Sequence, residues 1–220
     1  MTNNFFEPQS PTPVELEVRS PLPYRLPIWR LLIPLLVQTG IILAIPARSA
    51  YTYVTGETVV LQTIPVDPYD PLRGYSQTLD YDISQLRTLQ KLPGWQEVVT
   101  PKSISSDYLQ PGTELYVTLS PPKNSSTQPP QAWQPVKVSR SRPTSLAADQ
   151  IAIKGKSTGF SIKYGLETYY FPESRQQEIN RDIRQAQTGR QQRLVVEAKV
   201  DNQGNAVPVS FWVSDREYRF

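Results

Sequence analysis

The chain has 220 residues, a formal net charge of +3 and a mean hydropathy of −0.43, which suit one ordinary domain and exclude a protein that crosses a membrane many times. Cysteine and histidine are absent, which excludes disulfides, thiolate nucleophiles, imidazole bases and the usual zinc sites. Basic and acidic side chains are nearly balanced and interspersed beyond residue 50, so no basic surface for nucleic acid is predicted.

The first 25 residues are rich in proline and polar side chains. They show neither the period of a helix nor that of a strand. This composition cannot bury enough apolar surface to offset the entropy of ordering, so residues 1–25 are predicted to form a disordered cytoplasmic tail.

Residues 26–47 (LPIWRLLIPLLVQTGIILAIPA) are predicted to form a transmembrane helix. No charge occurs from Leu31 to Ile45, and about 20 largely apolar residues suffice to cross a hydrocarbon core of about 30 Å. Pro46 is predicted to end the helix. Two alternatives stay open: a signal peptide cleaved near Ala47-Arg48-Ser49, and a buried core helix, which the absence of a polar face disfavours.

The positive charges that flank this segment predict its direction. Arg19, Arg25 and Arg30 precede the apolar run, whereas Arg48 is the one basic residue that follows it closely. The excess of positive charge is retained in the cytoplasm. Residues 51–220 are therefore expected in the periplasm or a lumen, on the far side of a bacterial cytoplasmic or thylakoid membrane.

Short runs with strand periodicity follow, separated by turn residues. The strands are predicted at residues 57–64, 75–83, 113–119, 133–138, 151–155, 161–171, 194–200 and 206–213. The last two are expected to form a hairpin around Asp201-Asn202-Gln203-Gly204. Short connections of this kind predict a mainly β domain, an antiparallel barrel or sandwich.

One amphipathic helix interrupts the strands. Ser174 and Gln177 form a capping box, and Gly189 is placed to end the helix. The residues that share one face of it are Ile179, Ile183 and Ala186. Residues 84–92 are expected to add a helical turn or two.

A dense polar cluster precedes the second predicted strand, in the sequence DPYDPLRG. Asp67, Asp70 and Arg73 are candidates for a small site that binds a cation or a polar ligand. The alternative is a tight corner, because Asp-Pro and Arg-Gly punctuate turns and the carboxylates can cap backbone amides. The alternative is favoured, since each feature already has a local structural reason.

The stretch DPYDPLRGYSQTLDY resembles the signature of the GDYXXLXY family of membrane-anchored bacterial proteins. Gly74, Leu79 and Tyr81 occupy positions of that signature, whereas Tyr75 and Ser76 replace its aspartate and its first tyrosine. The resemblance implies a membrane-tethered domain and implies no particular activity.

A second block, residues 164–173, is similar to the later motif of that family, a Gly-Leu-Glu strand that ends in Phe-x-x-Glu. Its acidic residues, Glu167 and Glu173, join Tyr81 and the polar cluster as candidate ligand-binding residues. Along a straight strand these two carboxylates would stand about 20 Å apart, too far to share a proton. No catalytic residue, metal site or cofactor is predicted.

These features predict a membrane-anchored binding or scaffolding domain on the extracytoplasmic side. Its expected partners are the lipid bilayer, through residues 26–47, and a membrane protein or another envelope component. The alternative is a Ser/Lys hydrolase, since signal peptidases also place a β-rich domain after an N-terminal span. Lys154 and Lys156 could then serve as bases for Ser49 or a later serine. The prolines in Ser120-Pro121-Pro122-Lys123 prevent the helix that an S-x-x-K motif needs. A serine hydroxyl within hydrogen-bond reach of a lysine would distinguish the hydrolase.

Overall fold

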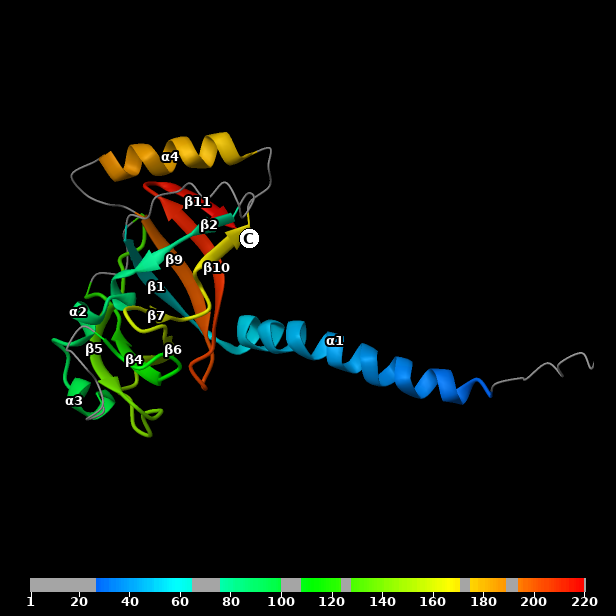
Figure 1. The fold of residues 1–220 in the computed structure, drawn as a ribbon. Coiled ribbons are helices and arrows are strands. Elements are labelled where there is room, and N and C mark those ends of the chain that lie inside the picture. Colours follow the sequence, from blue (N-terminus) through cyan, green and yellow to red (C-terminus); the bar gives the residue numbers. More distant parts are fainter. Residues whose placement is uncertain are drawn as a thin grey trace, which may run out of the picture. The chain divides into compact units, whose positions relative to one another are not determined.

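The computed structural model describes residues 27–64, 76–99, 108–123, 128–170, 175–188 and 194–219. A long N-terminal helix leads into a β-rich domain (Figure 1). The contacts within the chain group Met1–Ile42 into one compact unit and Leu43–Phe220 into another. The strands and the last turns of the first helix therefore belong to the second unit.

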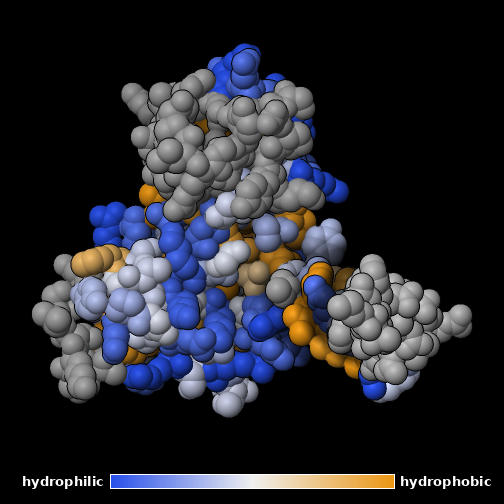
Figure 2. Space-filling view, turned by 45° about the vertical axis from the view of Figure 1, so that its right-hand side comes forward, coloured by the Kyte–Doolittle hydropathy of each residue, from blue (hydrophilic) through white to orange (hydrophobic). Residues whose placement is uncertain are grey.

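Helix α1 (Trp29–Thr55) has the length and composition of a membrane span. Its 27 residues extend about 40 Å at 1.5 Å per residue. The large apolar side chains from Leu31 to Leu43 are 47% to 69% exposed. In Figure 2, hydrophobic (orange) atoms are visible on the right, beside the grey ones. A core helix would bury one of its sides, so this exposure contradicts the core-helix alternative.

The predicted end of the helix at Pro46 is wrong, because α1 continues to Thr55. A proline removes one backbone hydrogen bond, but contacts between the last turns and the domain hold the helix beyond it. Gly56 then lets the chain enter the first strand directly. A Cβ at Gly56 would lie 2.5 Å from the carbonyl oxygen of Thr52 and 3.0 Å from backbone atoms of Val200, so a larger residue does not fit.

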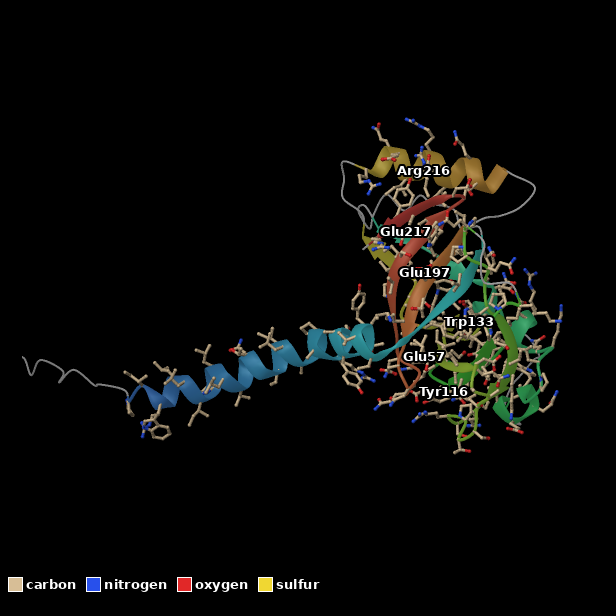
Figure 3. All side chains as sticks on the ribbon, turned by 180° about the vertical axis from the view of Figure 1, so that it is seen from behind. Glu57, Tyr116, Trp133, Glu197, Arg216 and Glu217 are labelled. Carbon is tan, nitrogen blue, oxygen red and sulfur yellow. The ribbon has the colours of Figure 1, made fainter. Side chains whose placement is uncertain are left out.

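The first sheet has five antiparallel strands in the order β11-β10-β9-β1-β3. Its strands are β1 (Glu57–Ile64), β3 (Asp80–Tyr81), β9 (Leu194–Val200), β10 (Ala206–Val213) and β11 (Arg216–Arg219). The predicted hairpin of β9 and β10 is confirmed at its predicted bounds. Figure 3 shows Glu197 and Glu217 on the strands of this sheet.

The second sheet has four antiparallel strands in the order β5-β4-β6-β7, and a separate ribbon pairs β2 with β8. Their bounds are β2 (Ser76–Thr78), β4 (Glu114–Ser120), β5 (Gln134–Ser139), β6 (Ile151–Ser157), β7 (Ile162–Lys163) and β8 (Thr168–Tyr170). The short helices are η1 (Asp82–Ser84), α2 (Leu86–Leu89) and α3 (Trp95–Val98).

The two sheets share one hydrophobic core. Leu61, Val196 and Phe211 contribute to it from the five-stranded sheet, and Val117 and Ile153 contribute from the four-stranded sheet; all five are at most 1% exposed. The described strands thus form sandwich-like antiparallel sheets and no closed barrel. This arrangement confirms the predicted mainly β class.

Helix α4 (Gln176–Thr188) lies across the five-stranded sheet near β11 (Figure 1). Its predicted apolar face, formed by Ile179, Ile183 and Ala186, is buried. On the same helix, Asp182 accepts a hydrogen bond from the hydroxyl of Tyr218 at 2.7 Å and pairs with Arg216 at 2.9 Å. These contacts join α4 to β11.

Two predicted strands are broken in the structure. Residues 76–78 pair with β8, whereas Asp80–Tyr81 pairs with β1, so the chain changes partners at Leu79. The segment 161–171 likewise divides into β7 and β8 around a turn at Gly165, whose φ is +81°. Periodicity could not predict these breaks, because distant partner strands set them. Helix α3 and strand β11 were not predicted.

Candidate functional site

The two sequence blocks that carry the predicted motifs lie side by side. In the β2–β8 ribbon, Gln77 pairs with Tyr169 and Thr78 with Thr168. The next amide, that of Leu79, donates to the carbonyl oxygen of Glu167 at 2.8 Å. Segments some 90 residues apart in the sequence therefore form one unit.

Hydrogen bonds of buried tyrosines link the segments of this unit. The Tyr81 hydroxyl donates to the carbonyl oxygen of Leu166 and also contacts the Tyr169 hydroxyl. A phenol has one proton and a carbonyl can only accept, so Tyr169 is the donor to Tyr81. The Tyr164 hydroxyl donates to the carbonyl oxygen of Ile83 at 2.7 Å. Each phenol thus satisfies a backbone or side-chain oxygen away from water.

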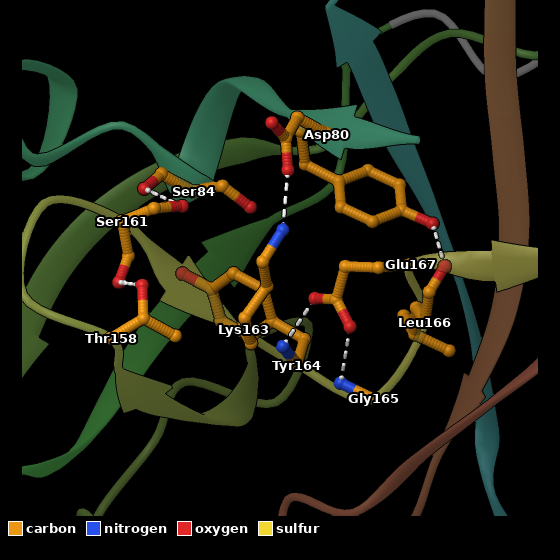
Figure 4. A network of polar contacts seen from close by, with 10 residues as sticks. Asp80, Ser84, Thr158, Ser161, Lys163, Tyr164, Gly165, Leu166 and Glu167 are labelled. Carbon is orange, nitrogen blue, oxygen red and sulfur yellow. Dashed lines mark hydrogen bonds and ion pairs between the residues drawn. The ribbon is translucent and has the colours of Figure 1, made fainter. Parts of the chain in front are cut away.

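The carboxylate of Glu167 caps the turn between β7 and β8. It accepts the backbone N–H of Tyr164 at 2.6 Å and that of Gly165 at 3.0 Å (Figure 4). Beside this turn, the Lys163 ammonium pairs with Asp80 at 2.7 Å, which links β7 to β3. The turn, the tyrosines and the ribbon together form what we call the motif junction. Its described side chains bind one another, which is the arrangement of a structural lock.

A lysine-lined cleft opens next to the motif junction. Its volume is about 320 Å³. The residues that line this lysine cleft include Lys154, Lys156, Lys163, Glu114, Gly165 and Asn205. The three lysines come from neighbouring strands: Lys156 stands opposite Lys163 across β6 and β7, and Lys154 lies two residues before Lys156 on the same face of β6. Lys154 pairs with Glu114 at 2.9 Å.

A second cleft, of about 470 Å³, adjoins the lysine cleft. Both are lined by Gly165 and Ala206. The other residues that line this apolar cleft are Ser49, Ala50, Tyr53, Val54, Val207 and Pro208. The last turns of α1 and the start of β10 therefore form its walls.

The β9–β10 turn (Asp201–Asn205) connects three elements beside these clefts. The Asp201 carboxylate accepts a hydrogen bond from the Thr52 hydroxyl at 2.8 Å, and both side chains are buried. The Arg48 guanidinium donates to the side-chain oxygen of Asn205 at 2.8 Å. Across the turn, the carbonyl oxygen of Gly204 accepts the backbone N–H of Lys154 at 2.9 Å. The end of α1 and the edge of β6 are thus fixed to one turn.

Comparison with protein families assigns the chain to one of them. The family model described as GDYXXLXY protein matches residues 38–211, most of the chain. The chain belongs to the GDYXXLXY family. No curated protein and no solved structure gives a match. The match includes both motif blocks and the β9–β10 turn.

The GDYXXLXY signature therefore carries structural residues where the structure describes it. Leu79 and Tyr81 are buried, and Glu167 caps a turn. The other predicted ligand and motif residues, Asp67, Asp70, Arg73, Gly74 and Glu173, lie outside the described residues. A ligand site at that polar cluster stays a prediction.

Burial changes the titration of the tyrosines in the motif junction. Burial, and the neighbouring groups Tyr169 and Glu167, raise the pKa of Tyr81 well above its ordinary value. Burial and the charge of Glu167 raise the pKa of Tyr164 in the same way. Burial also raises the pKa of Tyr169, although its hydrogen bond with Tyr81 opposes the shift.

We expect the GDYXXLXY domain to lose stability in alkaline solution. A folded-state pKa above the unfolded value of about 10 contributes stability that is complete below pH 10 and is lost as the pH rises toward the folded pKa. The midpoint of thermal unfolding should fall from about pH 10 upward, together with the appearance of phenolate absorbance. Tyr81→Phe should show a shallower fall, and an equal slope in both proteins would contradict this account.

The contacts of the lysines bear on the alternative hypothesis of a Ser/Lys hydrolase. Lys154 pairs with Glu114 and Lys163 pairs with Asp80, both through carboxylates. The buried hydroxyl of Ser84 has no hydrogen-bond partner, a lysine included, among the described residues. Among the residues that the structure describes, no hydrogen bond joins a serine hydroxyl to a lysine, and no cluster of three or more Asp and Glu side chains is placed to hold a metal ion. The serine–lysine hydrogen bond that would distinguish a hydrolase is thus not formed among the described residues.

Proposed function

We propose that this GDYXXLXY protein is a single-pass membrane protein whose β domain is a binding or scaffolding module on the extracytoplasmic side of a bacterial cytoplasmic or thylakoid membrane. The observation that supports the proposal is α1, whose apolar residues are exposed and whose last turns are fixed to the domain. A flexible linker would let the domain turn freely. The hydrogen bonds at the β9–β10 turn instead join Arg48 and Thr52, in the last turns of α1, directly to the domain.

The same charges that predict the orientation support an extracytoplasmic domain. Arg19, Arg25 and Arg30 precede the apolar run. Arg48 follows the run and donates to Asn205 of the domain. A membrane protein or an envelope component that reaches the clefts would be the partner of such a module.

The absence of cysteine makes a topology test direct, because any introduced cysteine is unique. With the protein produced in a bacterial cytoplasmic membrane, we expect Asp149→Cys, at an exposed loop residue of the domain, to react with a membrane-impermeant maleimide in intact cells. Ser10→Cys, in the N-terminal segment, should react after permeabilisation alone. The opposite pattern would overturn the orientation, and labelling of both in intact cells would overturn the single span.

Extraction and mass measurement test whether the anchor is retained. The membrane fraction should keep the protein after washing with alkaline carbonate, and its intact mass should be 25.0 kDa. A soluble protein that begins near Ser49 would instead show that the segment is a cleaved signal peptide. That result would overturn the anchored module.

A further inference from the structure

We propose that the lysine cleft and the apolar cleft together bind the phosphate-bearing headgroup of an anionic lipid, taken from the leaflet that the β domain faces. The phosphodiester would contact the lysines, and the glycerol and upper acyl carbons would contact the apolar cleft. This inference rests on the proposed function, because it needs α1 in the membrane.

The charge of the lysine cleft supports an anionic ligand. Lys156 and Lys163 are directly opposite each other on β6 and β7, a like-charge pair that destabilises a sheet. Lys163 is compensated by Asp80 and Lys154 by Glu114. Lys156 is exposed and has no ion pair within the described part of the chain. An anion in the cleft could therefore pair with the Lys156 ammonium without breaking either of these ion pairs.

The position of the apolar cleft supports a lipid over a soluble anion. Ala50, Tyr53 and Val54 line it from α1, and Val54 is 77% exposed. From Ala47 to Val54 the helix rises about 10 Å. Ser49, the first residue that lines the cleft, lies about 3 Å beyond Ala47 along the helix. A headgroup layer is about 5 to 8 Å thick on each side of the hydrocarbon core, so the cleft begins within that layer and extends to its outer edge. Tyrosine at position 53 also suits an interface.

The two clefts adjoin each other and share two lining residues. Gly165 and Ala206 line both of them. The amphipathic surface therefore changes from cationic to apolar over these two small residues. A lipid headgroup has the same succession, from phosphate to glycerol to acyl chain, whereas free phosphate would occupy the cationic part alone.

The test uses the full chain in a mild non-ionic detergent. Phosphatidylglycerol is titrated in, and lipids retained by the protein are counted by native mass spectrometry, with phosphatidylcholine as the zwitterionic reference. We expect preferential retention of phosphatidylglycerol. Lys156→Gln, which breaks no ion pair, should weaken it about fivefold, the effect of one lysine near an anionic surface.

Lys137→Gln is the matched control. Lys137 is exposed on β5 of the same sheet and does not line the lysine cleft. This variant should bind phosphatidylglycerol like the unaltered protein. Equal weakening by both substitutions would overturn the site in favour of a general surface charge.

Two further measurements distinguish a lipid ligand from a soluble anion, and this inference from the proposed function. Excess glycerol phosphate should displace the lipid poorly; displacement at equal concentrations would overturn the lipid assignment in favour of a soluble anion. If carbonate or labelling shows that the chain is not in the membrane, the proposed function fails. If the chain is anchored but shows no preference for phosphatidylglycerol, this inference alone is overturned.

Discussion

Tyr81→Ala should lower the free energy of unfolding of the β domain by about 4 kcal/mol, a loss typical of removing a large aromatic side chain from a core. Tyr81 is fully buried between the motif blocks, and its hydroxyl joins Leu166 to Tyr169. Chemical denaturation in detergent, followed by tryptophan fluorescence, measures the loss. The variant should still insert into the membrane, because α1 is unchanged.

Tyr81→Phe separates the hydroxyl from the ring. The ring still fills its space, but the Leu166 carbonyl and the Tyr169 hydroxyl each lose a buried partner, which costs about 1 to 3 kcal/mol. Tyr116→Phe is the control, since Tyr116 lies half-buried on β4 (Figure 3) and its loss should stay within about 0.5 kcal/mol. Full stability of both Tyr81 variants would show that the motif junction is not a structural lock.

Asp201→Ala should cost about 3 kcal/mol, since a buried carboxylate with several donors is removed. That carboxylate accepts the Thr52 hydroxyl, the backbone N–H of Gln203, and both the backbone and side-chain N–H of Asn205. Without it Thr52 is buried without this acceptor, and the end of α1 loses its link to the turn. Thermal unfolding, together with faster proteolysis near the end of α1, would measure both effects.

Asp149→Ala, at an exposed loop residue, is the control for that change and should leave stability nearly unchanged. Asp201→Asn keeps the shape of the side chain. The Thr52 hydroxyl can rotate to accept from the new amide, so this variant should lose less stability than the alanine variant. If Asp201→Ala left both stability and proteolysis unchanged, the turn would not couple the helix to the domain.

The same carboxylate gives stability a dependence on acid pH. Burial alone would raise the pKa of Asp201, but hydrogen bonds from Asn205, Thr52 and Gln203 outweigh it and lower the pKa. A lowered folded-state pKa contributes stability that is present above the unfolded pKa of about 4 and is lost as the pH falls through the folded value. Asp201→Asn should therefore remove part of the acid-induced loss seen in the unaltered protein.

Local sequence patterns were sufficient to predict the elements that depend on neighbouring residues alone. Strand β1 and the β9–β10 hairpin match their predicted bounds, because period-two alternation and a turn sequence mark them. The burial of Ile179 and Ile183 on α4 likewise follows from their helical spacing. The apolar run of α1 could likewise be recognised from the sequence alone.

Features that depend on distant partners could not be predicted in this way. Strand pairing with β8 and with β1 divides residues 75–83, and the turn at Asp201 holds α1 beyond Pro46. The lysine cleft was missed for the same reason, although Lys154 and Lys156 had been noticed as bases. Lys163 joins them only through the register of β6 and β7.

The pairing of β1 with β9 also constrains how the protein is made. Strand β1 directly follows α1, yet its partner β9 begins some 130 residues later, at Leu194. The central ladder of the five-stranded sheet therefore cannot close until the chain through β9 has left the ribosome. Domains that depend on contacts so distant in sequence fold slowly. Until then the β strands need protection from wrong pairing, and chains that stop before residue 194 should be degraded rather than accumulate as partly functional fragments.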